Sequence, residues 1–242
     1  MMNQPAANLA ETIRERENQR LRGDLLTVAS RVSHDLRTPL GGILSTAEAL
    51  KEILAQHDPG AVKLVDSLLN SAEEMSHLIR QVSFISRASA VPLPKVPVHM
   101  AEPVFGARQR LESRVLRRQA AVNEPASWPV VPGVTAWLEN IWWNLLVNAL
   151  KHGGERCQIE LGWTPEKDSH RFWIADNGPG VPQPLQGKLF KEFDALHEAR
   201  DVPGLGLSLV QRLVALQGGF CGHEQSKMGG ACFFFTLPLE PA

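Results

Sequence analysis

The amino-acid sequence predicts an α+β protein in which a helical hairpin precedes a domain of mixed strands and helices. Three observations support this prediction. Apolar residues recur at helical spacing through residues 8–85, strand-like and helical segments alternate after residue 134, and a proline-rich stretch at residues 88–103 separates the two patterns. Because such a stretch is typical of an extended linker, we expect two domains, residues 1–90 and 91–242.

The composition is that of an ordinary globular protein, with 43% hydrophobic and 21% charged residues. A formal net charge of −1 gives no overall attraction to nucleic acid or to an anionic membrane. Cys157, Cys221 and Cys232 have neither the even count nor the spacing of a disulfide framework or a zinc site. No run of residues approaches the length of a membrane span and the N-terminus lacks a signal-peptide profile, so we expect a cytoplasmic protein.

The first predicted helix spans residues 8–55, and turn-forming residues at 56–60 separate it from a second helix at 62–85. The spacing is close to a heptad between Leu21 and Leu36, which favours packing against other helices. Two helices alone bury little surface, so we expect a homodimer that completes a four-helix bundle. The alternative is a hairpin that packs on the second domain. The apolar positions of the first helix are Leu9, Ile13, Leu21, Leu25, Val28, Val32, Leu36, Ile43, Leu50 and Leu54.

A polar cluster interrupts this helix at residues 33–40. His34 is largely neutral at physiological pH and is therefore a candidate nucleophile, and Thr38 lies one turn along the same face. Asp35 could orient the imidazole, but adjacent helix residues do not naturally face each other, so that role needs a bend or a partner group. Pro39 could supply the bend. The alternative is a solvated helix turn that contains a histidine.

The second domain is predicted as an alternation of strands and helices. The predicted helices cover residues 100–118, 134–152 and about 204–217, and the predicted strands cover residues 96–99, 158–163, 170–175, 220–225 and 231–237. Between the first two helices we expect irregular structure, because the stretch contains Pro125, Pro129 and Pro132. The basic run at residues 108–118 is interpreted as a solvated helix face.

Polar side chains gather on one face of the predicted helix at residues 134–152. Asn144, Asn148 and Lys151 follow one another at steps of four and three residues. Amide oxygens are ligands that Mg²⁺ accepts, and a lysine suits phosphate. A solvent-exposed helix face would explain these residues equally well.

Two glycine-rich segments follow. Asp176, at the end of a predicted strand, could accept a hydrogen bond from the exocyclic amine of adenine, while Gly178 and Gly180 would let a nucleotide approach closely. Gly204 and Gly206 open a predicted helix whose free backbone amides could face phosphate. A simple turn after a strand would use the same residue types as the first segment.

The segment His34-Asp35-Leu36-Arg37-Thr38-Pro39-Leu40 resembles the phosphoacceptor box of bacterial sensor histidine kinases. Residues 144–152 are similar to the N box of that family, residues 176–180 to its first glycine box, residues 190–193 to its F box and residues 204–207 to its second glycine box. Two departures stand out. His152 replaces the usual aromatic residue of the N box, and Val202 with Pro203 replaces a glycine and a small hydroxyl residue before Gly204.

The resemblance implies a dimerisation and phosphoacceptor hairpin with an N-terminal coiled-coil extension, followed by an ATP-binding α/β sandwich of the GHKL or Bergerat type. It implies that His34 is phosphorylated from Mg-ATP and passes the group to an aspartate of a response regulator receiver domain. Asp35 would orient or deprotonate His34, and Thr38 would position water in a phosphatase reaction. In the ATP-binding domain, Asp176 would bind adenine and Asn148 magnesium, and the phosphates and the rest of the nucleotide would contact Asn144, Lys151, His152, Gly178, Gly180, Gly204, Gly206 and Leu207.

An alternative is a non-enzymatic phosphotransfer or scaffold protein with a degenerate ATP-binding domain. Val202 and Pro203 favour it, and the intact set Asn144, Asn148, Lys151, Asp176, Gly178 and Gly180 opposes it. The residues before the first helix are too few for a sensory domain, so the input is expected from an upstream sensor protein, from the coiled-coil end or from a region outside this sequence.

Overall fold

The computed structural model describes residues 32–55, 58, 60–69, 71, 72, 75, 76, 79, 93–187, 189, 190 and 206–239. Contacts divide the chain into two units, Met1–Pro92 and Leu93–Ala242, which we call the helical unit and the α/β unit. No helix within the described ranges is both long enough and apolar enough to cross a membrane.

In the helical unit, residues 32–54 form one continuous helical run that passes through Pro39, and residues 60–69 form a second. Asp58 begins the second run, because its Oδ1 accepts hydrogen bonds from the backbone N–H groups of Gly60 at 2.9 Å and Ala61 at 3.0 Å. A carboxylate in this position satisfies N–H groups that have no partner within the helix. The predicted turn therefore works as a helix cap.

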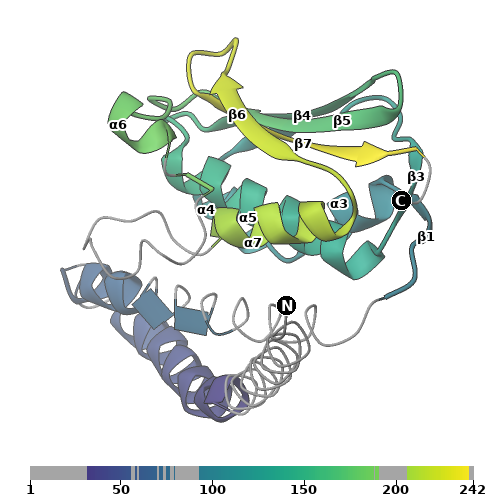
Figure 1. Ribbon diagram of the computed structural model, residues 1–242. Helices are drawn as coiled ribbons and strands as arrows, with labels where there is room; N and C mark the ends of the chain where they lie inside the picture. The colour runs from purple at the N-terminus through teal and green to yellow at the C-terminus, as the bar shows by residue number, and fades with distance from the viewer. Residues whose placement is uncertain are drawn as a thin grey trace, which may run out of the picture. The chain divides into compact units, whose positions relative to one another are not determined.

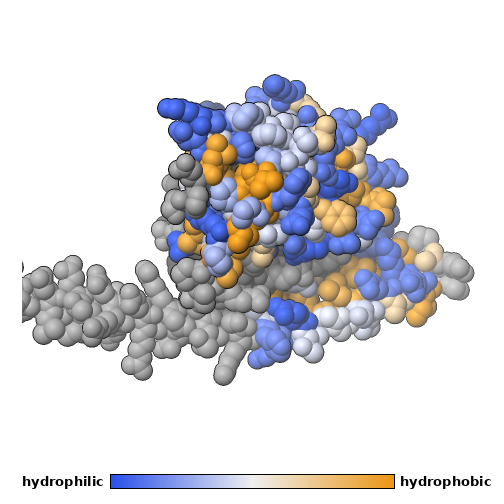
Figure 2. Space-filling view, turned by 90° about the vertical axis from the view of Figure 1, so that its right-hand side faces the viewer, coloured by the Kyte–Doolittle hydropathy of each residue, from blue (hydrophilic) through white to orange (hydrophobic). Residues whose placement is uncertain are grey.

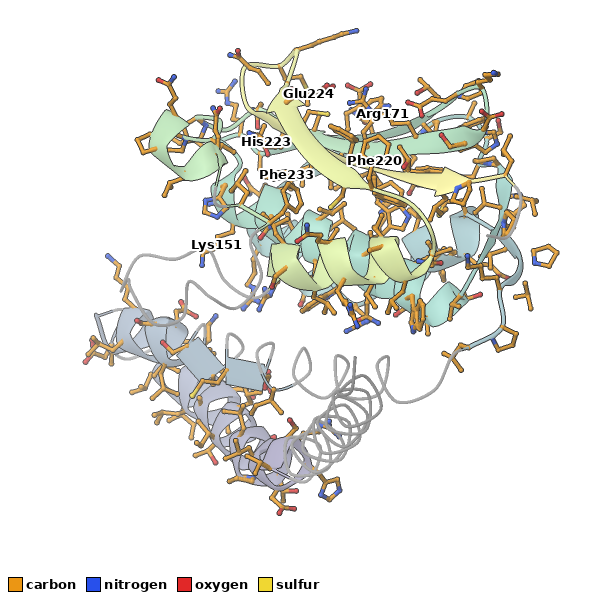
Figure 3. All side chains as sticks on the ribbon, in the orientation of Figure 1. Lys151, Arg171, Phe220, His223, Glu224 and Phe233 are labelled. Atoms are coloured by element: carbon orange, nitrogen blue, oxygen red, sulfur yellow. The ribbon has the colours of Figure 1, made fainter. Side chains whose placement is uncertain are left out.

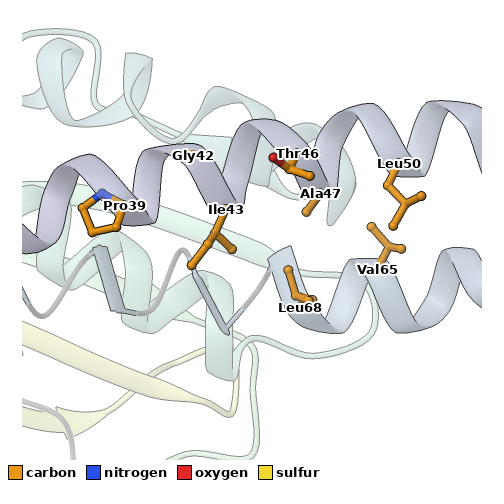
Figure 4. A pocket seen from close by; sticks show the side chains of 8 residues that line it. All are labelled: Pro39, Gly42, Ile43, Thr46, Ala47, Leu50, Val65 and Leu68. Atoms are coloured by element: carbon orange, nitrogen blue, oxygen red, sulfur yellow. The ribbon is translucent and has the colours of Figure 1, made fainter.

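The two helices contact each other through a small apolar core. Ala47, Val65 and Leu69 are buried there, with Leu44 and Leu54 packed against them. Other apolar residues of the first helix remain open, since Val32, Leu36, Ile43 and Leu50 are between 44% and 50% exposed. A groove of about 430 Å³ runs beside the core (Figure 4), and it is lined by Pro39, Gly42, Ile43, Thr46, Ala47, Leu50, Val65 and Leu68.

The α/β unit is a two-layer arrangement of helices on one face of a sheet (Figure 1). The five-stranded sheet has the order β2-β4-β5-β7-β6, in which only the β2–β4 pair is parallel. A separate antiparallel pair joins β1 and β3. The strands are β1 (Val96–His99), β2 (Ala121–Asn123), β3 (Val130–Gly133), β4 (Gln158–Pro165), β5 (Ser169–Asp176), β6 (Cys221–Gln225) and β7 (Ala231–Pro238). The helices are α3 (Ala101–Gln109), α4 (Glu112–Arg117), α5 (Thr135–His152), α6 (Gln183–Gln186) and α7 (Gly206–Leu216).

The core of the α/β unit lies between α5 and the sheet. Trp142 of α5 is fully buried, and its ring meets Phe235 edge-on with centroids 5.3 Å apart and Trp128 with centroids 5.4 Å apart. Its Nε1 donates to Sδ of Met100 at 3.1 Å, which satisfies the one polar atom of the ring. Because α5 also contacts α3 and α7, it is buried on more than one side.

The opposite face of the sheet carries a different kind of cluster. Arg171 of β5 lies over the ring of Phe234 at 3.9 Å and forms an ion pair with Glu224 of β6 at 2.8 Å. Phe220 meets the same ring edge-on (Figure 3). On the face shown in Figure 2, hydrophobic side chains form small groups separated by hydrophilic ones, in keeping with the mixed composition of the chain.

Gln217, just after α7, joins three parts of the α/β unit although its side chain is fully buried. Its Oε1 accepts from the N–H of Val134 at 3.1 Å, and its Nε2 donates to the carbonyl of Leu213 at 3.2 Å. The backbone carbonyl of Gln217 accepts from Nζ of Lys95 at 3.1 Å. The end of α7 is thereby fixed to the start of α5 and to the chain before β1.

The structure confirms the predicted fold class and, in the α/β unit, most elements, with boundaries shifted by one or two residues. Of the helices predicted at residues 8–55 and 62–85, residues 8–31 and most of 70–85 lie outside the described residues. The single helix predicted at residues 100–118 is wrong, because α3 ends at Gln109 and α4 begins at Glu112. Leu111 takes the non-helical angles φ −110° and ψ 3° and is only 2% exposed, whereas α4 has no buried residue. The break therefore lets Leu111 enter the core while the basic helix after it stays at the surface.

The irregular stretch predicted around Pro125, Pro129 and Pro132 contains two short strands, β2 and β3. Pro132 is tolerated in β3 because that strand pairs only with β1, so it is an edge. The three cysteines are free and lie in or next to strands. Burial raises the pKa of Cys221 to about 12 and of Cys232 to about 11, which keeps both thiols protonated.

Candidate functional site

The C-terminal half of α5 carries the polar residues predicted to bind the phosphates and the metal. Asn144 is buried, and its Nδ2 donates to the carbonyl of Asn140 at 2.7 Å. Asn148 is half-buried, and Lys151 and His152 are exposed. In Figure 3, Lys151 projects from the last turn of the helix. Exposure therefore increases along this face towards the end of α5.

Asp176 is the last residue of β5 and is only 3% exposed. Its Oδ1 accepts hydrogen bonds from the backbone N–H groups of Gly178 at 2.8 Å and Ala231 at 3.2 Å. These two bonds fix the plane of the carboxylate. Since both engage the same oxygen, Oδ2 is the atom that could accept a hydrogen bond from a bound amine.

Glycines surround this carboxylate because no side chain would fit. A Cβ on Gly178 would lie 2.1 Å from the carbonyl oxygen of His152, and a Cβ on Gly230 would lie 2.3 Å from Oδ1 of Asp176. Gly180 has a φ of +75°, in the left-handed region that favours glycine. The loop after β5 thus packs directly on the end of α5 and on the start of β7.

His152 lies where these elements meet. Partial burial lowers the pKa of its imidazole, the positive charge of Lys151 lowers it further, and the negative charge of Asp176 opposes both effects. The neutral form of His152 is therefore favoured in the folded protein.

Phe190, in the segment that resembles an F box, packs on the edge of the same region. Its ring meets Phe233 of β7 with centroids 6.3 Å apart, and the ring of His223 of β6 has the same centroid distance from Phe233. Figure 3 labels His223 and Phe233. Leu189 beside it is buried. These contacts hold Leu189 and Phe190, which follow α6, against the sheet.

The second glycine box is described only in part. Gly206 is the first residue of α7, and Leu207 is buried beside it. Gly204, the departures Val202 and Pro203 and the last three residues of the F box lie outside the described residues.

The candidate phosphoacceptor lies in the helical unit. His34, Asp35 and Thr38 are exposed in the helical run 32–54, and Nδ1 of His34 lies 3.2 Å from Oδ1 of Asp35. The contact forms although the two residues are adjacent in the sequence. Both side chains are largely exposed, so they can rotate toward each other within a continuous helical run.

Several residues at the site were not singled out from the sequence as site residues. Ala231 supplies an N–H group to Asp176, and Gly230 makes room for that carboxylate. Both lie 54 or more residues away in the chain, so only the pairing of β5 with β7 brings them to Asp176. Within the described ranges, no group of three or more histidine, cysteine, aspartate or glutamate side chains could hold a metal ion.

Two family models match the chain. The His Kinase A (phospho-acceptor) domain matches residues 24–90, and the histidine kinase-, DNA gyrase B- and HSP90-like ATPase matches residues 133–241.

The chain is similar to the methanogenesis regulatory histidine kinase FilI of Methanothrix harundinacea, with 31% identity over 210 residues, which are 86% of this chain and 24% of FilI. It is 30% identical over 233 residues to the sensor protein KdpD of Escherichia coli, covering 93% of this chain and 25% of KdpD. The chain thus spans about a quarter of the length of these relatives. Among solved structures, full-length ShkA in complex with AMPPNP matches with a TM-score of 0.61 and 26% identity, covering 88% of this chain and 46% of ShkA.

Proposed function

Because this chain belongs to the sensor histidine kinases, we propose that it transfers the γ-phosphoryl group of ATP to His34 and then to an aspartate of a response regulator receiver domain. The observation that carries this proposal is the buried Asp176 carboxylate, held at the end of β5 by two backbone N–H groups and enclosed by glycines. Such a group binds an adenine amine without rearranging, and the similar protein ShkA was solved with the ATP analogue AMPPNP.

The arrangement at His34 supports the choice of nucleophile. With Nδ1 at 3.2 Å from Asp35, the carboxylate accepts the Nδ1 proton and leaves the lone pair on Nε2. Attack by Nε2 on the γ-phosphorus forms the N–P bond and breaks the bond to the β,γ-bridging oxygen, and ADP leaves. The Nδ1 proton stays shared with Asp35, which stabilises the positive imidazole ring. In the second step, an aspartate oxygen of the receiver domain takes the phosphoryl group and His34 becomes neutral again.

The residues of α5 fit the remaining parts of Mg-ATP. Asn148 offers an amide oxygen to Mg²⁺, which when bound neutralises phosphate charge. Asn144 and Lys151 lie on the same helix face and would contact the phosphates. Gly206 and Leu207, at the start of α7, would contribute to the same phosphate site, together with Gly204, which lies outside the described residues. His152 contributes to the nucleotide site from the end of α5, where its backbone carbonyl lies close to Gly178. Thr38, one turn from His34, positions water when the regulator is dephosphorylated.

We also propose that the helical unit forms a homodimer. The exposed residues Val32, Leu36, Ile43 and Leu50 and the groove in Figure 4 form a face that helices of a second copy would cover. The activity is expected in the cytoplasm, where ATP and receiver domains are available, and the signal is expected from an upstream sensor.

Incubation of the full chain with radiolabelled Mg-ATP tests the proposal. Label that is stable in base and labile in acid is expected on the wild type, and it is expected to disappear in His34→Gln and Asn148→Ala. The matched control is His99→Gln, since His99 is an exposed histidine of the α/β unit. A folded protein that takes up no label would instead support the phosphotransfer or scaffold alternative.

A further inference from the structure

We propose that Arg118, at the end of α4, and Asn177, in the loop after β5, are positioning residues that fix the end of α5 and the turn after it, and so set how Lys151 and Asp176 meet one nucleotide. This inference rests on the proposed function. Both side chains form hydrogen bonds with backbone atoms, so their effect on the nucleotide is indirect.

Arg118 binds the C-terminal end of α5. Its Nε donates to the carbonyl of Leu150 at 3.2 Å, and its Nη2 donates to the carbonyl of Gly153 at 3.0 Å. The last carbonyls of a helix have no partner within it, and a positive charge there complements the helix dipole. The planar guanidinium bridges two carbonyls on either side of Lys151 and His152. It therefore fixes the turn that presents both residues.

Asn177 binds the turn between α5 and β4 from the other side. It stands between Asp176 and Gly178, and its Nδ2 donates to the carbonyl of Arg156 at 2.8 Å. Its Oδ1 accepts from the N–H of Gln158 at 2.9 Å. Both ends of the amide are used, so neither alanine nor aspartate can replace it without losing a bond.

The loop that carries Asn177 also contacts the end of α5 directly. A Cβ on Gly178 would lie 2.1 Å from the carbonyl oxygen of His152, which is too close for any side chain. A Cβ on Gly154 would lie 3.2 Å from the carbonyl oxygen of Asn177. A shift of one segment therefore moves the other. Hydrogen bonds need donor–acceptor distances of about 2.7–3.2 Å, so a shift of about 1 Å in these binding groups would weaken their contacts with a nucleotide.

The test uses the full chain with four single variants, Arg118→Lys, Asn177→Asp and the controls Arg212→Lys and Asn123→Asp, whose residues are exposed elsewhere in the α/β unit. Arg118→Lys keeps the charge and loses the planar fork. Asn177→Asp keeps an acceptor for Gln158 and loses the donor to Arg156. For each variant we would measure the Kd of ATP by calorimetry, the KM and kcat of autophosphorylation and the thermal midpoint.

We expect Kd and KM for ATP to rise about 10- to 100-fold in Asn177→Asp and about 5- to 10-fold in Arg118→Lys, with kcat within about twofold of the wild type. The controls Arg212→Lys and Asn123→Asp should match the wild type in Kd, KM, kcat and thermal midpoint. The double variant should raise Kd by less than the product of the single effects, because both residues act on one junction.

A purely structural role predicts the opposite pattern, with a lower thermal midpoint, a smaller active fraction and an unchanged KM. That result in Arg118→Lys, or in both variants, would overturn the inference. If Asn177→Asp does not fold, the KM of Arg118→Lys decides alone. If the wild type itself neither binds ATP nor takes up label, the proposed function fails and the inference fails with it.

Discussion

The two units of this chain hold their functional groups in opposite ways. The side chains of His34 and Asp35 are 77% and 79% exposed, whereas Asp176 is 3% exposed and tied to two backbone N–H groups. If His34 is the phosphoacceptor that we propose, it has to meet first a nucleotide and then a receiver domain, so it cannot be enclosed. A group that recognises one ligand gains from being fixed in advance.

The apolar residues show the same contrast. The α/β unit buries Trp142, Phe172 and Phe235 completely, while the helical unit leaves Ile43 and Leu50 nearly half exposed. The α/β unit therefore completes its own core. Among the described residues of the helical unit, one small core cluster contains Ala47, Val65 and Leu69, with Leu44 and Leu54 packed against it. We propose that a second copy covers the apolar residues that remain exposed.

The largest expected effect comes from placing charge on that open face. We expect the double variant Ile43→Glu/Leu50→Glu to raise the dimer Kd at least about 1000-fold, because burying each such side chain contributes about 1.5–3 kcal/mol and the face occurs twice in a dimer. Sedimentation equilibrium measures this, with the exposed Glu52→Gln as control. A variant whose dimer Kd equals that of the wild type would mean that a different surface joins the protomers. If the wild type and the variant are both monomeric, the result would favour a hairpin that packs on the α/β unit.

Asp35→Asn separates chemistry from stability. We expect the rate of His34 phosphorylation to fall about 100-fold, since the amide no longer accepts the Nδ1 proton as a charged partner. The thermal midpoint should stay within about 1 °C, because exposed ion pairs contribute little to stability. Glu48→Gln, on the same exposed helix, is the control. A rate equal to that of the wild type would remove Asp35 from the mechanism.

Gly178→Ala tests the close packing of the α/β site. A Cβ 2.1 Å from the carbonyl of His152 forces the backbone to move, and we expect the free energy of unfolding to fall by about 1–3 kcal/mol. ATP affinity should fall with it. Gly187→Ala is the matched control, because a Cβ there meets nothing within 4 Å. Equal denaturation curves for the two variants would contradict the described contact.

The smallest effect concerns pH. In the unfolded chain His152 titrates near 6.5, and in the folded protein burial and Lys151 lower this pKa. As the pH falls below about 6.5, the unfolded state binds more protons and the folded state loses stability. We expect the drop in thermal midpoint between about pH 7.5 and pH 5.5 to be smaller in His152→Gln than in the wild type or in His99→Gln. An equal drop in thermal midpoint in all three proteins would show that folding does not lower the pKa of His152.

The sequence predicts most elements of the α/β unit because their periodicity is local. The helix α5 has a strong apolar pattern, and Asp176 with Gly178 and Gly180 forms a recognisable group at a strand end. The break at Leu111 could not be predicted, because it depends on the burial of that side chain by distant residues. The strands β2 and β3 are only three and four residues long and lie among prolines, so they lack a periodic signal.

The site is predicted less completely than the fold. Residue types at motif positions indicate which side chains bind a ligand. The hydrogen bond from Ala231 to Asp176 and the bonds of Arg118 and Asn177 instead join segments that are distant in the sequence and meet only in the folded unit. The contact between His34 and Asp35 depends on side-chain rotamers, which helical periodicity does not specify.

The hydrogen bond from Nζ of Lys95 to the backbone carbonyl of Gln217 has a practical consequence for studying the α/β unit by itself. A fragment that starts at β1 would lack Lys95, and the carbonyl at the end of α7 would lose its partner, although Gln217 also supports the first turn of α5 through Val134. The residues before the first strand are therefore part of the folded unit. Fragments for crystallisation or calorimetry should begin at residue 93 or earlier, and measurements of ATP affinity on shorter ones would describe a weakened protein.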